Sequence, residues 1–245
     1  MKPAPEAASP TSISRMEWLL IAAAALTILS SVLGLLPLHF VCKPLTMLIA
    51  MAWVYLRASQ VRALERFDLL LIAALTASMA GDVFLMLPGG YFIPGLASFL
   101  VAHLFYIALF RQGITWFPNR PALLLTLGVG AAMYAWVWGG LTDPVLKVAV
   151  AAYVGVISLM VAQAMGRAMV LHDTASKAVA LGACVFMLSD SLIAINRFVQ
   201  PLPMVSLWVL TTYYAAQFLM VRNAKPTISS LRATGLSVRA TTRNP

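Results

Sequence analysis

Long apolar runs alternate along the sequence with short polar segments that contain proline or glycine. Runs of roughly 20 apolar residues have the length that a helix needs to cross a bilayer. The first run, Trp18 to Leu36, is too long for the core of a signal peptide and further runs follow it, so we interpret it as a retained helix. The pattern predicts eight transmembrane helices, over residues 17–36, 40–57, 68–87, 92–110, 121–139, 145–165, 176–195 and 203–221.

Proline and glycine mark most of the predicted connections, among them Pro37, Pro88-Gly89-Gly90 and Gly139-Gly140. Residues 1–16 are rich in proline, alanine and serine, which is typical of a disordered tail. The remaining chain divides into an eight-helix transmembrane domain, residues 17–222, and a basic flexible tail, residues 223–245. With 61% hydrophobic and only 10% charged residues, an ordinary soluble domain is excluded. The predicted fold class is therefore all-α, a polytopic membrane protein.

The net charge of +9 would suit a nucleic-acid-binding protein, but the basic residues cluster in alternate connections. If the N-terminus is cytoplasmic, only Lys43, Lys147 and Arg197 lie outside. The inside segments then hold 14 of the 17 basic residues: Lys2, Arg15, Arg57, Arg62, Arg66, Arg111, Arg120, Arg167, Lys177, Arg222, Lys225, Arg232, Arg239 and Arg243. We expect both termini in the cytoplasm, no nucleic acid as a partner, and the inner membrane as the location if the protein is bacterial.

Two stretches of the chain match weakly at an offset of 108 residues. The identical pairs are Met79/Met187, Asp82/Asp190, Ser98/Ser206, Tyr106/Tyr214 and Phe110/Phe218. Chance identity is high in apolar sequence, so duplication and coincidence both stay open. A true duplication would give two parallel four-helix halves.

Asp82 and Asp190 stand inside the most apolar parts of the third and seventh predicted helices. A carboxylate deep in the bilayer costs roughly 2.5 to 3.5 kcal/mol on insertion scales, so it usually serves a function. The two helices run in the same direction, and each aspartate precedes the predicted outer end by five residues, roughly 8 Å. We expect the two side chains at one depth in the outer half of the membrane. The alternative is a pair of structural carboxylates bonded to Lys43 and to tyrosines.

Lys43 opens the second predicted helix, with Pro44 in its first turn. It can pair with a carboxylate or a lipid phosphate, or simply extend toward the interface. His103 and Tyr106 share one face of the fourth helix, where the histidine can bond a carboxylate, move a proton or be satisfied by a neighbouring helix.

Further polar side chains lie in the sixth, seventh and eighth predicted helices. Hydrogen bonds between helices explain Tyr153, Tyr213, Tyr214 and Gln217 adequately. Asn196 and Arg197 follow Asp190 by six and seven residues, about two turns, where the arginine contacts either a headgroup or water. Cys42 and Cys184 give no metal spacing, and no serine-hydrolase motif is present, so we expect no metal and no cofactor.

Taken in order, these residues resemble the YhhN-like family of eight-span membrane proteins, which includes the lysoplasmalogenases. The resemblance runs from the first helix to the eighth and is carried by Lys43-Pro44, Gly81-Asp82, Gly95, Phe99, His103, Tyr106, Ser189-Asp190, Asn196, Tyr214 and Gln217. It implies hydrolysis of the vinyl ether bond of a lysoplasmalogen, a single-chain phospholipid, to a long-chain aldehyde and a glycerophospho-ethanolamine or glycerophospho-choline. Bacterial members of the family need not share that physiological substrate.

The implied reaction fits the two aspartates. A vinyl ether is hydrolysed by protonation of its β-carbon, which gives an oxocarbenium ion that water then attacks. As in the two-carboxylate glycosidases, one carboxylic acid and one carboxylate suffice. We assign this acid/base pair to Asp82 and Asp190, with the donor left open. We assign the other polar residues to substrate binding: Lys43, His103, Tyr106, Tyr153, Asn196, Arg197, Tyr213, Tyr214 and Gln217.

Two other functions remain open at this point. Paired intramembrane carboxylates with a histidine also suit a proton-coupled or cation-binding transporter. Against it, the polar residues gather toward one side of the membrane, where a lipid pocket would lie. The second alternative is a lipid-binding protein without catalysis. The oligomeric state is undetermined by the sequence.

Overall fold

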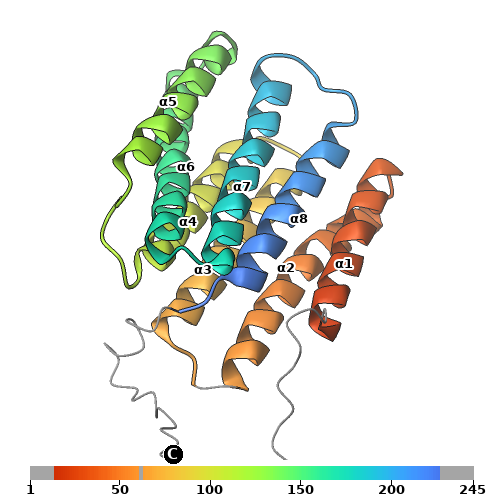
Figure 1. Cartoon of the computed structure of the whole chain (residues 1–245). Coiled ribbons are helices and arrows are strands. Elements are labelled where there is room, and N and C mark those ends of the chain that lie inside the picture. Colours follow the sequence, from red (N-terminus) through yellow and green to blue (C-terminus); the bar gives the residue numbers. More distant parts are fainter. Residues whose placement is uncertain (1–13, 61–62, 227–245) are drawn as a thin grey trace, which may run out of the picture.

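The computed structural model describes residues 14–60 and 63–226, and Figure 1 shows their arrangement. All regular elements of the described chain are helices. Most of both predicted tails lies outside the described residues. Its α-helices are α1 (Arg15–Val32), α2 (Leu36–Ser59), α3 (Arg66–Met86), α4 (Phe92–Arg111), α5 (Arg120–Val137), α6 (Pro144–Leu171), α7 (Thr174–Phe198) and α8 (Val205–Asn223), with a short 3₁₀ helix, η1 (Trp138–Gly140), after α5.

Seven of these described helices, α1 to α7, are long and apolar enough to cross a membrane. The last helix, α8, falls short of that hydropathy because it carries Tyr213, Tyr214 and Gln217 among its apolar residues. The protein is therefore a multi-pass membrane protein with an all-α fold, as the hydropathy pattern predicts.

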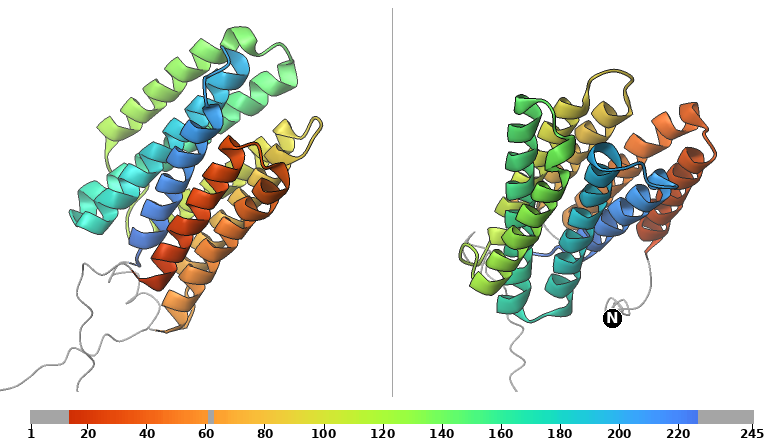
Figure 2. Two further views of the ribbon diagram at one scale, coloured as in Figure 1. Left: turned by 90° about the vertical axis from the view of Figure 1, so that its right-hand side faces the viewer. Right: turned by 90° about the horizontal axis from the view of Figure 1, so that it is seen from above.

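Seven of the described helices form a closed ring, and α5 packs outside it. Around the ring, α1 packs on α2, α2 on α3, α3 on α4, α4 on α6, α6 on α7, α7 on α8 and α8 on α1. The remaining helix, α5, packs mainly on α6, and the view from above in Figure 2 shows it at the edge of the bundle. The ring encloses buried side chains from α2, α3, α4, α6, α7 and α8.

The turn between α1 and α2 lies earlier than the sequence pattern suggests. It falls at residues 33–35, where Gly34 adopts a positive φ of 68° that other residues rarely tolerate. Pro37 consequently lies in the first turn of α2 and does not separate the helices. The prediction that Pro44 occupies a first turn was wrong, because Pro44 lies inside α2. Since proline has no N–H, the carbonyl of Phe40 lacks its usual helical partner.

The sixth helix continues six residues beyond its predicted end. Polar side chains in its last two turns are buried against the connection between α4 and α5. Gln163 donates to the carbonyl of Thr115 (3.1 Å) and accepts from the N–H of Phe117 (2.8 Å). Arg167 donates to the carbonyl of Gln112 (2.6 Å). The hydrogen bond of Arg167 satisfies a charged side chain in the part of α6 beyond the predicted end.

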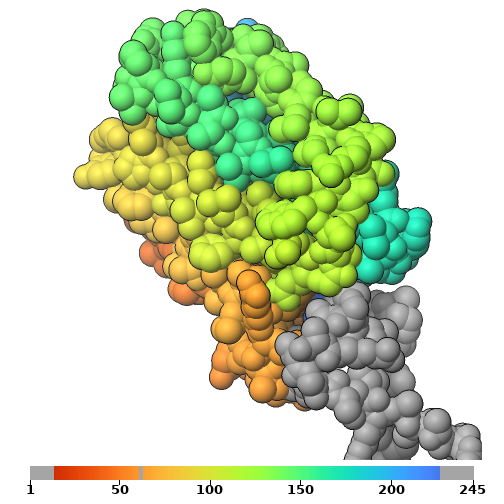
Figure 3. Space-filling view, turned by 90° about the vertical axis from the view of Figure 1, so that its left-hand side faces the viewer, coloured from red at the N-terminus to blue at the C-terminus, as the bar shows by residue number. Residues whose placement is uncertain are grey.

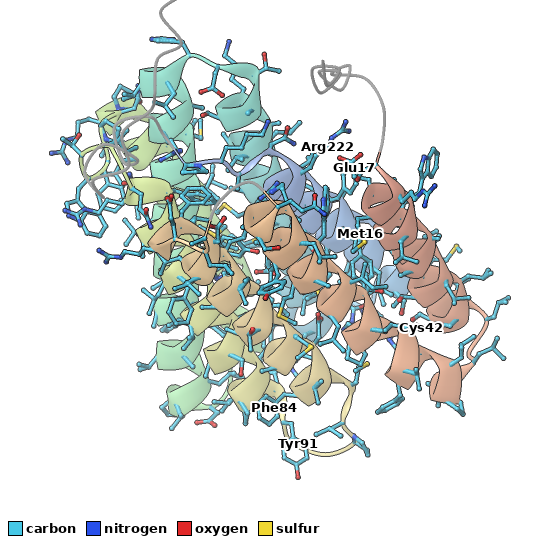
Figure 4. All side chains as sticks on the ribbon, turned by 90° about the horizontal axis from the view of Figure 1, so that it is seen from below. Met16, Glu17, Cys42, Phe84, Tyr91 and Arg222 are labelled. Atoms are coloured by element: carbon cyan, nitrogen blue, oxygen red, sulfur yellow. The ribbon has the colours of Figure 1, made fainter. Side chains whose placement is uncertain are left out.

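The first and last helices meet at one end of the bundle. Arg222 at the end of α8 forms an ion pair with Glu17 at the start of α1 (3.2 Å), and Figure 4 shows the two side chains next to each other. Arg57 at the end of α2 donates to the carbonyls of Val221 and Ala224. The basic residues at these helix ends therefore gather on the side where α1 begins and α8 ends.

Candidate active site

Asp82 lies in a buried cluster built by α2, α3 and α8. Its Oδ1 is 3.0 Å from the Lys43 ammonium, and its Oδ2 accepts a hydrogen bond from the Tyr213 hydroxyl (2.7 Å). Asp82 is 2% exposed and Lys43 is 8% exposed. A buried carboxylate needs such a counter-charge and such donors to remain ionised. We call Lys43, Asp82 and Tyr213 the Asp82 cluster.

Asp190 lies in a second cluster, built by α4, α6 and α7. The Tyr153 hydroxyl donates a hydrogen bond to its Oδ2. His103 Nε2 is 3.9 Å from the same oxygen, too far for a hydrogen bond. Among the described residues, no lysine or arginine lies within ion-pair distance of this carboxyl group. We call His103, Tyr153 and Asp190 the Asp190 cluster.

Aromatic rings join the two clusters into one site. The Phe186 ring contacts Tyr213 of the Asp82 cluster (5.5 Å between centroids) and His103 of the Asp190 cluster (5.0 Å). Phe99 packs edge-on against both Phe186 and Tyr213. Phe186 therefore contacts members of both clusters.

Glycines bring α3 and α4 together at the level of this site. A Cβ atom at Gly81, next to Asp82, would lie 2.5 Å from the Phe99 ring. A Cβ atom at Gly95 would lie 2.8 Å from Leu85. A side chain at either position would push α4 away, so both glycines hold Phe99 against the clusters.

An apolar cavity, which we call the tail cavity, extends from Asp190 between α4, α5, α6 and α7. It holds about 660 Å³ of empty space, its openings included, and Asp190 is the one carboxyl group among its described walls. The walls are Leu85, Phe92, Leu96, Phe99, Gly130, Met133, Val150, Tyr153, Val154, Ile157, Met187, Asp190, Ser191, Ile193, Ala194 and Phe198.

A second, polar cavity, which we call the mouth, adjoins it. The mouth holds about 1260 Å³, its opening included, and is lined by the basic side chains His39, Lys43 and Arg197 together with Asn196. Three residues line both spaces, namely Leu85, Phe92 and Ile193. The two cavities are therefore neighbours, with Lys43 facing one and Asp190 facing the other.

Two further residues that the sequence singles out, Asn196 and Arg197, lie at the mouth. The Arg197 guanidinium stacks 4.0 Å above the Phe92 ring. Asn196 lies beside it and accepts a hydrogen bond from the backbone N–H of Leu202, which ties down the connection between α7 and α8.

Five of the predicted substrate-binding residues line neither cavity: His103 and Tyr213, which belong to the two clusters, and Tyr106, Tyr214 and Gln217. Tyr106 donates a buried hydrogen bond to Gln217 (2.6 Å), linking α4 to α8. Tyr214 packs beside Tyr213, with 5.2 Å between ring centroids. The structure thus gathers Lys43, Tyr213, Tyr153 and His103 around the aspartates, and it leaves Tyr106, Tyr214 and Gln217 in the packing between helices.

The equal depth expected for the two aspartates rested on predicted helix ends that were wrong. Asp82 precedes the end of α3 by four residues, about 6 Å, whereas Asp190 precedes the end of α7 by eight, about 12 Å. The reason is that α7 continues to Phe198, past the predicted end at residue 195.

Sequence reasoning missed His39. It lies four residues before Lys43, so both face the mouth from one side of α2. The spacing of four between two basic residues on one helix was the signal that could have identified it. No three His, Cys, Asp or Glu side chains gather as a metal site requires within residues 14–60 and 63–226.

Comparison with known proteins places these features in a family. The YhhN family model matches residues 38–224. "Lysoplasmalogenase TMEM86B" of Homo sapiens is 33% identical over 192 residues, which cover 78% of this chain and 74% of that protein. The Sus scrofa protein of the same name is 36% identical over 179 residues, covering 73% and 71%.

A bacterial relative is more distant. "Lysoplasmalogenase" of Mycobacterium tuberculosis (strain CDC 1551 / Oshkosh) is 31% identical over 156 residues, which cover 61% of this chain and 58% of that protein. No solved structure matches the chain. Because the family model spans most of the sequence, including both aspartates and Lys43, the chain belongs to the YhhN family.

Proposed function

We propose that the protein hydrolyses the vinyl ether bond of a lysoplasmalogen, giving a long-chain aldehyde and a glycerophospho-ethanolamine or glycerophospho-choline. The names of its relatives support this substrate. The observation that carries the proposal is that two carboxyl groups lie in unlike surroundings beside two adjoining cavities: Asp190 lines the apolar cavity, and Asp82 is ion-paired with Lys43, which lines the cationic one. A single-chain phospholipid has matching parts: a hydrocarbon chain, a phosphate, and a vinyl ether where they join.

In this mechanism Asp190 is the proton donor. It has no lysine or arginine beside it in the described structure, and the apolar walls of the tail cavity disfavour a negative charge on it. Asp82 is the carboxylate, because the Lys43 ammonium and the Tyr213 hydroxyl stabilise its charge.

The proton balance closes with these two groups. Asp190 gives its proton to the β-carbon, and the Asp82 carboxylate stabilises the oxocarbenium ion and takes a proton from the attacking water. When the hemiacetal collapses, Asp82 returns that proton to the leaving alcohol oxygen and Asp190 takes the hydroxyl proton. Both groups then regain their starting states without a metal or a covalent intermediate.

The mouth supplies the phosphate site of this proposal. Arg197 and His39 face it, and no carboxylate other than the lysine-paired Asp82 lies next to them in the described structure. Arg197 has the planar donor geometry that binds phosphate in two hydrogen bonds. Tyr153 and His103 position Asp190, while Tyr106, Tyr214 and Gln217 act only through packing.

The membrane arrangement belongs to the same proposal. All eight helices cross the bilayer, with both termini in the cytoplasm and the mouth at the outer face. The basic residues at the ends of α2, α4 and α8 support this orientation. In a bacterial cell the protein would lie in the inner membrane. The repeat of two four-helix halves stays a prediction.

Three lysophospholipids with one headgroup and one chain length test the function. The purified protein in lipid bilayers is incubated with the alkenyl, the alkyl and the acyl form, and aldehyde release is measured. We expect aldehyde from the alkenyl lipid and no product from the other two. Asp143→Asn, at the cap of α6, serves as the matched control for Asp82→Asn and Asp190→Asn. Cleavage of the acyl lipid, or full activity in both site variants, would refute the proposal.

A further inference from the structure

The helices α4 and α5 follow one another in the chain but scarcely touch. Each packs on α6, and α5 has no other extensive contact. Figure 3 shows the result, with α6 visible at the bottom of a hollow bounded by α4 and α5. The outer face of α5 is apolar, since Leu124, Leu125 and Val129 are all more than half exposed. The hollow therefore faces lipid in a membrane-embedded chain.

This hollow lies where the tail cavity approaches the surface. The cavity is lined by Leu96 from α4, by Gly130 and Met133 from α5 and by Val154 from α6. Leu96 and Met133 both line the cavity and are partly exposed. At Gly130 a Cβ atom would lie 3.0 Å from Val154, which shows how closely α5 approaches α6 there. The hollow is therefore a gap between α4 and α5, since α5 and α6 are in close contact.

We propose that the gap between α4 and α5 is a lateral portal for the hydrocarbon chain of the lipid. The proposal rests on the function given above and adds its route: the chain slides in from the bilayer between Leu96 and Met133 while the headgroup stays at the mouth. The vinyl ether then reaches Asp190, the carboxyl group on the cavity wall. After cleavage the aldehyde returns to the bilayer and the glycerophospho-alcohol leaves through the mouth.

A second lipid-facing hollow offers the rival route. It lies between α1, α2 and α8, lined by Leu20, Met47, Tyr214 and Phe218 among others. Neither aspartate lines it, and it shares no wall with the tail cavity or the mouth. A chain bound there would have to displace buried rings to bring its ether bond to Asp190.

Chain length gives the first test. A chain that continues through the portal keeps its outer methylenes among lipid tails, which are as apolar as the cavity wall, so added methylenes change binding little. For alkenyl lysophospholipids of about 16 to about 22 carbons, we expect kcat/KM at fixed bilayer mole fraction to vary by less than about threefold. A steep fall beyond one length would show a closed pocket and overturn the portal.

Narrowing the portal gives the second test. We expect Met133→Trp to lower kcat/KM for long-chain substrates about tenfold, and to leave a water-soluble substrate with a chain of about four carbons within twofold, since that substrate arrives through the mouth. Leu125→Trp on the lipid-facing side of α5 is the matched control and should change neither. An equal loss on both substrates in Met133→Trp, or no loss on either, would contradict the portal.

A binding test separates the portal from the chemistry. An uncleavable alkyl lysophospholipid with a photoreactive diazirine at its chain end should label α4, α5 or neighbouring bilayer lipids in the unmodified protein. Labelling of α1 and α8 instead would overturn the portal. If the unmodified protein releases no aldehyde from any alkenyl lipid, the proposed function fails, whereas labelling still decides the route.

Discussion

The two carboxyl clusters share an aspartate and a tyrosine but differ in their third member, a lysine beside Asp82 and a histidine beside Asp190. Around Asp82, an ammonium at 3.0 Å and a phenol hold a negative charge in place. Around Asp190, which lines an apolar cavity, a phenol donates a hydrogen bond and an imidazole lies 3.9 Å away, and no lysine or arginine of the described residues compensates a charge. Surroundings rather than residue type therefore divide the work, because burial without a counter-charge favours the neutral acid and a lysine favours the carboxylate.

Removing either carboxyl group should have the largest effect. We expect Asp190→Asn to lower kcat by about 10³-fold, since a positioned acid or base typically contributes 10² to 10⁴. Asp82→Asn should cost about as much, because the two groups act in one cycle. Aldehyde release by each variant and by the double variant measures this. Losses that multiply in the double variant would indicate independent roles and break the proposed pair.

The lysine should matter next. In Lys43→Met the Asp82 carboxylate loses its counter-charge and tends to take up a proton, so both carboxyl groups become acids. We expect about 10²-fold lower activity, with partial recovery in Lys43→Arg, which keeps the charge. Rates of the two variants across pH test the point. If the rate of Lys43→Met rose at high pH to that of Lys43→Arg, protonation of Asp82 alone would explain the loss. Equal rates of the two variants at every pH would exclude a role for the lysine charge.

The tyrosines offer a matched pair with smaller effects. Tyr153→Phe and Tyr213→Phe each delete one hydroxyl that donates to one aspartate. A hydrogen bond to a charged or buried group is worth about 1 to 3 kcal/mol. We expect about tenfold loss for Tyr153→Phe and about threefold for Tyr213→Phe, because Asp82 keeps Lys43. Kinetics of both variants check the order, and the reverse order would contradict the contrast between the clusters.

The smallest effect is expected away from both clusters, at helix caps. Asp173 caps α7 and Asn119 caps α5, each accepting a backbone hydrogen bond. Replacing either by alanine should cost about 1 kcal/mol of stability. The hydrogen bond from the backbone N–H of Ser176 lowers the pKa of Asp173 below its usual 3.8. The Ser176 hydroxyl lowers this pKa further, by a smaller amount.

The sign of this shift sets the pH window. Because the folded-state pKa is lowered, the contribution of the Asp173 charge is present above pH 3.8 and is lost as the pH falls through the folded-state value. The cost of Asp173→Ala should therefore shrink in that acid range, while that of Asn119→Ala stays constant because asparagine does not titrate. Thermal unfolding at several pH values tests this, and a parallel pH dependence of both variants would count against it.

The hydropathy pattern predicts the eight α-helices of the described structure. The long apolar runs suffice for that, since only a helix satisfies its backbone inside a membrane. They fail where polar side chains are satisfied by the fold. Arg167 lies beyond the predicted end of the sixth helix at residue 165, yet it continues α6 because a connection carbonyl accepts its hydrogen bond. The position of Pro44 within its helix was mispredicted because the turn at Gly34 lets α2 begin earlier than the pattern indicates.

The site was predictable in its charged members only. An aspartate or lysine inside an apolar run is visible in the sequence, so Asp82, Asp190 and Lys43 stand out. Tyrosines and glutamine are not distinguished by pattern, and Tyr106, Tyr214 and Gln217 pack between helices while Tyr153 and Tyr213 bond the aspartates. The gap between α4 and α5 has no signature in hydropathy, because lipid-facing and cavity-facing residues are equally apolar.

Infrared difference spectroscopy of the protein in bilayers tests the division of labour between the clusters most directly. A protonated carboxylic acid gives a carbonyl stretch that an ionised carboxylate lacks. At neutral pH we expect one such band that disappears in Asp190→Asn and persists in Asp82→Asn. A band lost in Asp82→Asn instead, or bands lost in neither variant, would contradict the assignment of acid and base.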